Sequence, residues 1–131
     1  MHKFLDGHVE TFVIEKHNDA RGELGVIESF FKDFEIKRCF WITGVPNNTY
    51  RGEHGHQNST QILIPISGKI EILCKTSNGN SWSTTLGSDL GLIIKPNTWI
   101  QMKFNNPNEV LLVLTDTSYS EDQVFTEFNN K

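Results

Sequence analysis

Short apolar runs alternate with turn-forming residues along most of the chain. Turn signals recur roughly every eight to twelve residues, as at 18–22 (NDARG), 45–48 (VPNN), 77–80 (SNGN) and 105–108 (NNPN). Between them lie runs rich in β-branched and aromatic residues, at 36–43, 61–67, 69–75, 81–86, 91–95, 99–104 and 110–116. This spacing predicts an all-β sandwich or barrel. A short helix or turn is expected only at 29–36 and in the tail after Ser120.

Two of the runs alternate between an apolar and a mixed face, as a strand with one buried face does. Residues 61–67 place three isoleucines on one face and Gln61 on the other. Residues 99–104 oppose an apolar face to a mixed face that carries Trp99 and Gln101. We expect the mixed faces to line a partly polar barrel lumen, which would be the functional site.

The composition narrows the class of protein. A chain of 131 residues is the size of one ordinary domain, so we expect a single domain over residues 1–131. The net charge of −4 argues against nucleic acid or an anionic membrane surface as a partner. No apolar run approaches the length needed to span a bilayer, and the first residues lack the apolar core of a signal peptide. We therefore expect a cytoplasmic protein.

The stretch RGEHGHQ at 51–57 carries the densest group of chemically active side chains. His54 and His56 are two positions apart, so in an extended chain they point to the same side, with Cα atoms about 6.5 Å apart. They can therefore reach one ligand together. A metal site, a proton-transfer site and a polar loop are the three interpretations.

The spacing around the histidines resembles the first motif of the cupins. That motif reads HxH, four residues, Glu, six residues, Gly, and here His54 and His56 are followed by Gln61 and Gly68. In the second motif of metal-binding cupins, the histidine position holds Gln101. Divalent first-row metals prefer imidazole, carboxylate or thiolate ligands over amides. We therefore expect no bound metal, and proton chemistry becomes the better interpretation of the pair.

A narrower resemblance covers nearly the whole chain, in five blocks at 19–28 (DARGELGVIE), 36–42 (IKRCFWI), 51–73, 91–102 and 110–125. In these blocks the chain resembles the dTDP-4-keto-6-deoxyglucose 3,4-ketoisomerases, metal-independent cupins that make dTDP-3-keto-6-deoxyhexoses for 3-amino sugars. The resemblance implies a cupin jelly roll, a homodimer, a dTDP-linked 4-keto-6-deoxy sugar as substrate, and no cofactor.

The chain also departs from that family. Where the family commonly has two tyrosines shortly after a Lys-Arg pair, this chain has Phe40 and Trp41 after Lys37 and Arg38. Where the family commonly reads Trp-His-Glu, this chain reads Trp-Ile-Gln at 99–101.

The chemistry explains the residue types. Moving a ketone from C4 to C3 requires removal of the C3 proton, an enediolate, and a proton returned to C4. Imidazole accepts and releases protons near neutral pH, so we predict His54 and His56 as the catalytic pair, with His56 as the C3 base. A guanidinium stabilises the enediolate oxygen, and Arg51 is the candidate.

The remaining predicted site residues would bind substrate. Arg21 and Arg38 are candidates for diphosphate contacts, because guanidinium pairs bidentately with phosphate oxygens. Gln61, Trp99 and Gln101 are expected to line the lumen.

Two alternatives stay open at this point. A 3,5-epimerase of dTDP-4-keto sugars is another cupin with an RGxH stretch, although it usually lacks the second histidine of HxH. A non-catalytic sugar-binding cupin would account for the two departures from the family pattern.

Overall fold

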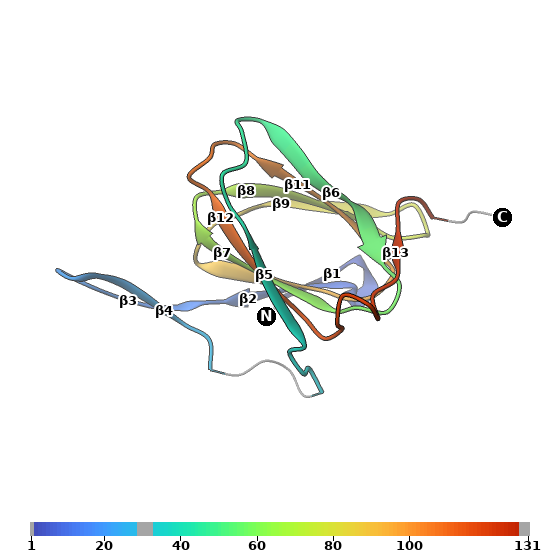
Figure 1. Ribbon diagram of the computed structural model, residues 1–131, viewed down its shortest axis with the longest axis horizontal. Helices are drawn as coiled ribbons and strands as arrows, with labels where there is room; N and C mark the ends of the chain where they lie inside the picture. Colours follow the sequence, from blue (N-terminus) through green and yellow to red (C-terminus); the bar gives the residue numbers. More distant parts are fainter. Residues whose placement is uncertain (1, 29–32, 129–131) are drawn as a thin grey trace.

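Two β-sheets face each other and enclose the main apolar core in a computed structural model that describes residues 2–28 and 33–128 (Figure 1). The strands are β1 (His2–Phe4), β2 (Val9–Val13), β3 (Glu15–Asp19), β4 (Gly22–Val26), β5 (Arg38–Ile42), β6 (Thr49–His56), β7 (Gln61–Ser67), β8 (Ile70–Lys75), β9 (Ser81–Leu86), β10 (Leu90–Ile94), β11 (Thr98–Phe104), β12 (Val110–Thr115) and β13 (Val124–Phe125). Helix within the described residues is limited to the 3-10 turn η1 (Leu5–Gly7), and no helix there could span a membrane.

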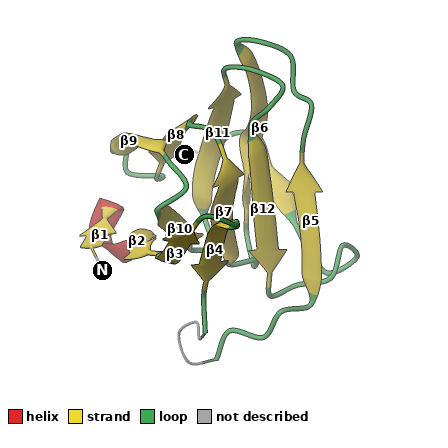
Figure 2. Cartoon of the chain, turned by 90° about the vertical axis from the view of Figure 1, so that its left-hand side faces the viewer, coloured by secondary structure: helices red, strands yellow, loops and turns green. Residues whose placement is uncertain are grey.

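The sheets are antiparallel and built from strands distant in sequence. One sheet has six strands in the order β1-β2-β10-β7-β12-β5, and the facing sheet has five in the order β13-β6-β11-β8-β9. Figure 2 shows β12 beside β5 and β11 beside β6, in agreement with their registers. The ribbon of β3 and β4 projects away from both sheets (Figure 1).

The prediction of an all-β jelly roll is confirmed. The seven apolar runs identified in the sequence form β5 and β7 to β12. β1 to β4, β6 and β13 lie outside the predicted strands. In the tail, a turn at 119–121 leads into β13, and of the segment 29–36 the first four residues lie outside the described part.

The apolar side chains form two clusters. The larger lies between the sheets and includes Leu63, Ile100, Met102 and Phe104, whereas the smaller covers the outer face of the six-stranded sheet. The three-isoleucine face of β7 points outward, as expected, and buries Ile62 and Ile64 in the smaller cluster. The same expectation was wrong for β11, whose apolar face points inward. β11 belongs to the five-stranded sheet, where the polar residues of each strand face solvent.

A buried carboxylate fixes the connection between β11 and β12. Glu109 is 2% exposed, and it accepts hydrogen bonds from the backbone N–H groups of Asn105, Asn106 and Lys69. Gly68 makes room for it, because a Cβ there would lie 2.5 Å from Glu109 Cγ.

Candidate active site

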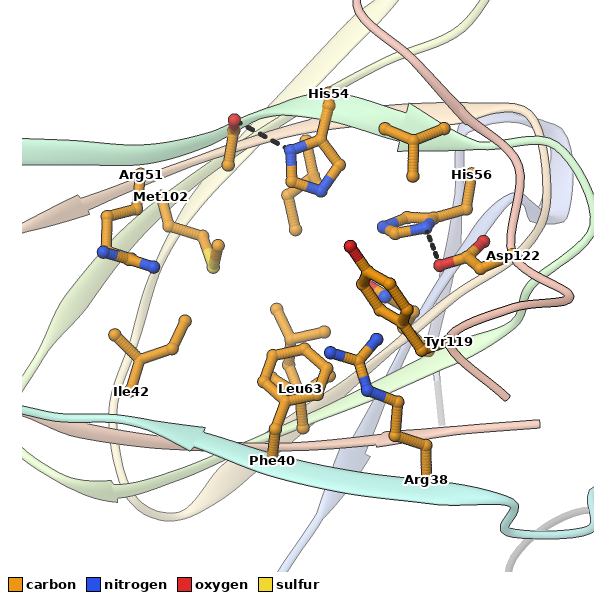
Figure 3. A pocket seen from close by; sticks show the side chains of 15 residues that line it. Arg38, Phe40, Ile42, Arg51, His54, His56, Leu63, Met102, Tyr119 and Asp122 are labelled. Carbon is orange, nitrogen blue, oxygen red and sulfur yellow. Dashed lines mark hydrogen bonds and ion pairs between the residues drawn. The ribbon is translucent and has the colours of Figure 1, made fainter. Parts of the chain in front are cut away.

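A cavity of about 440 Å³ opens between the two sheets (Figure 3). Its volume falls within the range of about 300–1,000 Å³ that is usual for small-molecule sites. Both sheets and the segment that leads into β13 contribute side chains. The lining residues are Arg38, Phe40 and Ile42 of β5, Arg51, Gly52, His54 and His56 of β6, Gln61 and Leu63 of β7, Ile100 and Met102 of β11, Val113 of β12, and Tyr119, Asp122 and Val124.

The two histidines lie side by side on the inner face of β6, as the sequence predicted. Their ring centroids are 4.9 Å apart and the rings meet edge to face at 72°. A bulge opposite the step from Ile100 to Gln101 leaves Glu53 unpaired and gives it a φ of 60°. Because the bulge precedes the histidines, regular alternation carries both rings to the cavity.

Each imidazole is anchored through its Nδ1 atom. His54 Nδ1 lies 2.8 Å from the carbonyl oxygen of Gly52, and His56 Nδ1 lies 2.7 Å from Asp122 Oδ2. Both partners are acceptors, so each Nδ1 carries the hydrogen and donates it. In the neutral ring the Nε2 lone pair is then free, and Figure 3 shows both Nε2 atoms directed into the cavity. The site therefore presents two oriented proton acceptors.

Burial and neighbouring charges shift the pKa of His56. The side chains of His56 and Asp122 are 9% and 6% exposed. Burial is the largest influence and lowers the pKa of His56 below its usual 6.5; Asp122 opposes this, while the charges of His54 and Arg38 lower it further. His56 is therefore a neutral base near pH 7.

The C-terminal segment that carries Asp122 is tied to the residues just after β6. The N–H of Gln57 donates to the carbonyl of Gln123 at 2.8 Å, and Asn58 bonds both Glu121 and Gln123. β13 then pairs with the end of β6. These contacts place a carboxylate beside His56 although the two residues are 66 positions apart.

Two arginines face the cavity from its two ends (Figure 3). The guanidinium of Arg38 lies between aromatic rings, 4.7 Å from the centre of Phe40 and 5.1 Å from that of Tyr119. Arg51 lies opposite Met102 in the pairing of β6 with β11. Within the described residues neither guanidinium forms an ion pair with a carboxylate. Both are therefore available to an anionic ligand.

This constellation sits in a chain that matches the family model described as "FdtA: WxcM-like, C-terminal" over residues 7–130. The chain belongs to this FdtA/WxcM-like family.

Named relatives agree with the match. The TDP-4-oxo-6-deoxy-alpha-D-glucose-3,4-oxoisomerase of Aneurinibacillus thermoaerophilus is 27% identical over 113 residues, which are 86% of this chain and 81% of the relative. QdtA, a sugar 3,4-ketoisomerase from Thermoanaerobacterium thermosaccharolyticum solved with TDP, is 30% identical with a TM-score of 0.81, covering 92% of this chain and 89% of QdtA. WlaRA, a TDP-fucose-3,4-ketoisomerase from Campylobacter jejuni, is 31% identical with a TM-score of 0.75, covering 91% and 89%.

Five of the eight site residues predicted from the sequence line the cavity of this FdtA/WxcM-like chain, namely Arg38, Arg51, His54, His56 and Gln61. Three do not: the expected place of Trp99 and Gln101 in the lumen was wrong, and a substrate contact by Arg21 stays a prediction. Trp99 and Gln101 lie on the outward face of β11: Trp99 Nε1 donates to the carbonyl of Thr126 at 3.0 Å, and Gln101 lines a shallow depression on the outside. Arg21 lies on the ribbon of β3 and β4, 89% exposed and paired with Asp19.

Asp122 and Tyr119 are the cavity residues with acid–base groups that sequence reasoning missed. Both lie in the polar stretch SYSED, which has no periodicity and no motif spacing. No local signal in the sequence could have paired this stretch with the histidines.

Among the described residues, no group of three or more His, Cys, Asp or Glu side chains is placed to hold a metal ion. Gln61 lies in the cavity with the histidines, and an amide is a poor ligand for a first-row metal. Metal independence stays a prediction.

Proposed function

We propose that this chain is an isomerase that moves the keto group of a dTDP-linked 4-keto-6-deoxyhexose from C4 to C3. Its product would supply the 3-amino-3,6-dideoxy sugars of bacterial surface glycans. The names of its relatives support the substrate class. The cavity supports the chemistry, since it combines proton acceptors with cationic groups.

The observation that carries this proposal is the pair of imidazoles anchored at Nδ1. A ketoisomerase must remove a proton from one carbon and return a proton to its neighbour, so two adjacent groups with free Nε2 atoms match the two steps. His56 removes the C3 proton, because it is the buried ring with the carboxylate partner. His54 manages the proton that returns to C4.

The arginines and the glutamine complete the assignment. Arg51 stabilises the negative charge that develops on the enediolate oxygen, an effect strengthened in a site that excludes water. Arg38 contacts the diphosphate, and Gln61, which is 6% exposed, orients the sugar by hydrogen bonds.

The decisive experiment supplies the protein with dTDP-4-keto-6-deoxyglucose in deuterated buffer and follows the sugar by NMR. A 3-keto product with deuterium at C4 is expected. Hydrogen exchange at C3 and C5 without a 3-keto product would identify an epimerase instead, and no change at all would leave a binding protein.

Two matched variants assign the histidines in the same assay. His56→Asn should abolish both isomerisation and exchange of the C3 hydrogen, whereas His54→Asn should block product formation and leave C3 exchange running. The opposite pattern would exchange the two roles. Full turnover by both variants would remove catalysis from this stretch.

A homodimer is part of this proposal. Trp41 and Ile66, on the outer face of the six-stranded sheet, are 65% and 52% exposed, and Leu24 on the projecting ribbon is 61% exposed. A groove of about 400 Å³, lined by apolar side chains and by the Lys16–Glu23 ion pair, lies between the ribbon and this face. Exposed apolar surface of this kind marks an interface, and a second copy of the chain would cover it.

Sedimentation equilibrium tests the dimer. Ile66→Asp should give a monomer, whereas Gln101→Asp, on the outside of the other sheet, should leave the dimer intact. A monomeric wild-type protein would contradict this part of the proposal.

A cytoplasmic location also stays a prediction, which fractionation of the source cells would test.

A further inference from the structure

The reaction proposed above moves two protons between carbons and oxygens, and the histidine pair accounts for only one of them. C3 loses a proton and C4 gains one that has exchanged with solvent, and the hydroxyl proton on O3 ends on O4. The first transfer breaks a C3–H bond and forms a C4–H bond through the imidazoles. The second breaks O3–H and forms O4–H, and it needs a group that can both donate and accept.

Tyr119 is the one side chain with a hydroxyl among the described residues that line the cavity. It reaches the cavity from the turn at 119–121, and Figure 3 shows its hydroxyl directed toward the side where the histidines lie. Phe40, on the facing strand β5, offers only a ring. The geometry points to Tyr119 as a third catalytic residue, which relays the hydroxyl proton from O3 to O4; this inference rests on the proposed function.

The relay balances without any co-reactant. As His56 takes the C3 proton, the electron pair of the C3–H bond forms a C3=C4 double bond, the π pair of the C4=O4 bond moves to O4, and the Tyr119 hydroxyl donates its proton there. As a proton returns to C4, the O3–H bond gives its proton to the phenolate, and the C3 carbonyl forms. Tyrosine ends as it began.

Local contacts hold the ring over the cavity. The guanidinium of Arg38 lies 5.1 Å from the centre of the Tyr119 ring. At this distance the cation is attracted to the face of the ring, and the attraction stabilises the position of the ring. The turn that carries it is closed by Ser118, which donates to Glu121 through both its N–H and its hydroxyl. Asn58 fixes the next residues. The ring itself is 79% exposed, so a substrate entering the cavity would meet it and cover it.

The chain offers a matched control, because it contains only two tyrosines. Tyr50 lies on the outside of β6, beside Lys103, and does not line the cavity. Tyr119→Phe keeps the ring over Arg38 and removes only the hydroxyl, and Tyr50→Phe makes the same chemical change elsewhere. Any general effect of losing a phenol appears in both.

Tyr119→Phe is expected to form product about 100- to 1,000-fold more slowly, with dTDP affinity within about threefold of wild type because the ring contact with Arg38 remains. Exchange of the C3 hydrogen should fall less than product formation, since the enediolate can still form as an anion near the arginines. The ratio of exchange to product therefore rises, which a merely structural defect would not cause. Tyr50→Phe should behave as wild type.

A second measurement does not depend on the Tyr119 variant. In Tyr50→Phe, Tyr119 is the single tyrosine, so ¹³C at Cζ gives one NMR signal. That signal should shift further when the equilibrium mixture of keto sugars is added than with dTDP alone, which reaches the ring only through Arg38. The relay by Tyr119 is refuted if Tyr119→Phe forms product at the wild-type rate, or if the keto sugars shift the Tyr119 signal no further than dTDP does. Either result would leave the proposed ketoisomerase activity unaffected. If wild type and Tyr50→Phe both leave the sugar unchanged, the proposed function itself fails.

Discussion

Replacing Asp122 by asparagine tests whether the C-terminal segment takes part in the chemistry. The substitution keeps the size of the side chain and removes its charge, and it acts on the hydrogen bond of 2.7 Å to His56 Nδ1. An asparagine can turn its NH₂ group toward Nδ1, which would move the imidazole hydrogen to Nε2 and block the base. We expect slower turnover with little change in dTDP affinity.

The magnitude follows from the burial of the pair. Both side chains are less than a tenth exposed, so solvent does not replace the lost partner. A hydrogen bond to a charged group contributes about 1.5–3 kcal/mol, and each 1.4 kcal/mol is about tenfold in rate. The rate of C3 deprotonation should therefore fall about 10- to 150-fold.

The pH profile separates this role from a structural one. Asp122 raises the pKa of His56, so its removal should lower that pKa further and move the acidic limb of kcat/KM to lower pH. The assay is C3 hydrogen exchange by NMR across pH, with Glu71→Gln as control, since Glu71 is a carboxylate on the outside of β8 that does not line the cavity. Turnover within a factor of about two of wild type, or an unmoved acidic limb, would refute the reasoning.

Three other predictions concern the wild-type profile, metal and the fold. Because burial holds the pKa of His56 below 6.5 and the base must be neutral, kcat/KM should fall to half of its plateau only below pH 6.5; a half-maximal point above pH 7 would count against His56. Activity should survive exhaustive chelation, whereas a loss that one added metal restores would contradict the proton-only mechanism. Glu109→Gln should lower the free energy of unfolding by roughly 1–3 kcal/mol in urea denaturation, and Glu15→Gln, whose side chain is 62% exposed, should leave it within about 0.5 kcal/mol.

The strands that sequence reasoning found are those in which local pattern and tertiary burial agree. β7 and β12 carry β-branched and aliphatic residues with turn signals on both sides, so their type could be predicted without knowing their partners. β6 was recognised as a site but not as a strand. Its sequence, TYRGEHGH, contains two glycines, and three charged or titratable side chains point to the cavity. Because these functional residues occupy positions that are apolar in other strands, the alternation that predicts a strand is absent.

Alternation alone could not decide which face of a strand meets the cavity. The pattern in β11 separates Ile100 and Met102 from Trp99 and Gln101 correctly, yet the assignment of the second group to the lumen was wrong. The deciding fact is that β11 pairs with β8 and β6 in a sheet whose outer side meets solvent. That fact depends on strand order, which a single sequence does not encode in its periodicity.

Tyr119 and Asp122, which were missed, depend for their position on the HGH stretch at 54–56 that identified the site. In HGH at 54–56 the outer histidines face the cavity, and Gly55 faces the other way, toward β13. A Cβ at Gly55 would lie 2.3 Å from Phe125 Cζ and 2.7 Å from the carbonyl oxygen of Thr98, so only glycine lets Phe125 pack there. Phe125 anchors the segment that carries Tyr119 and Asp122. The motif therefore specifies two things: the histidines on one face of β6, and on the other face the space for the C-terminal segment that completes their site.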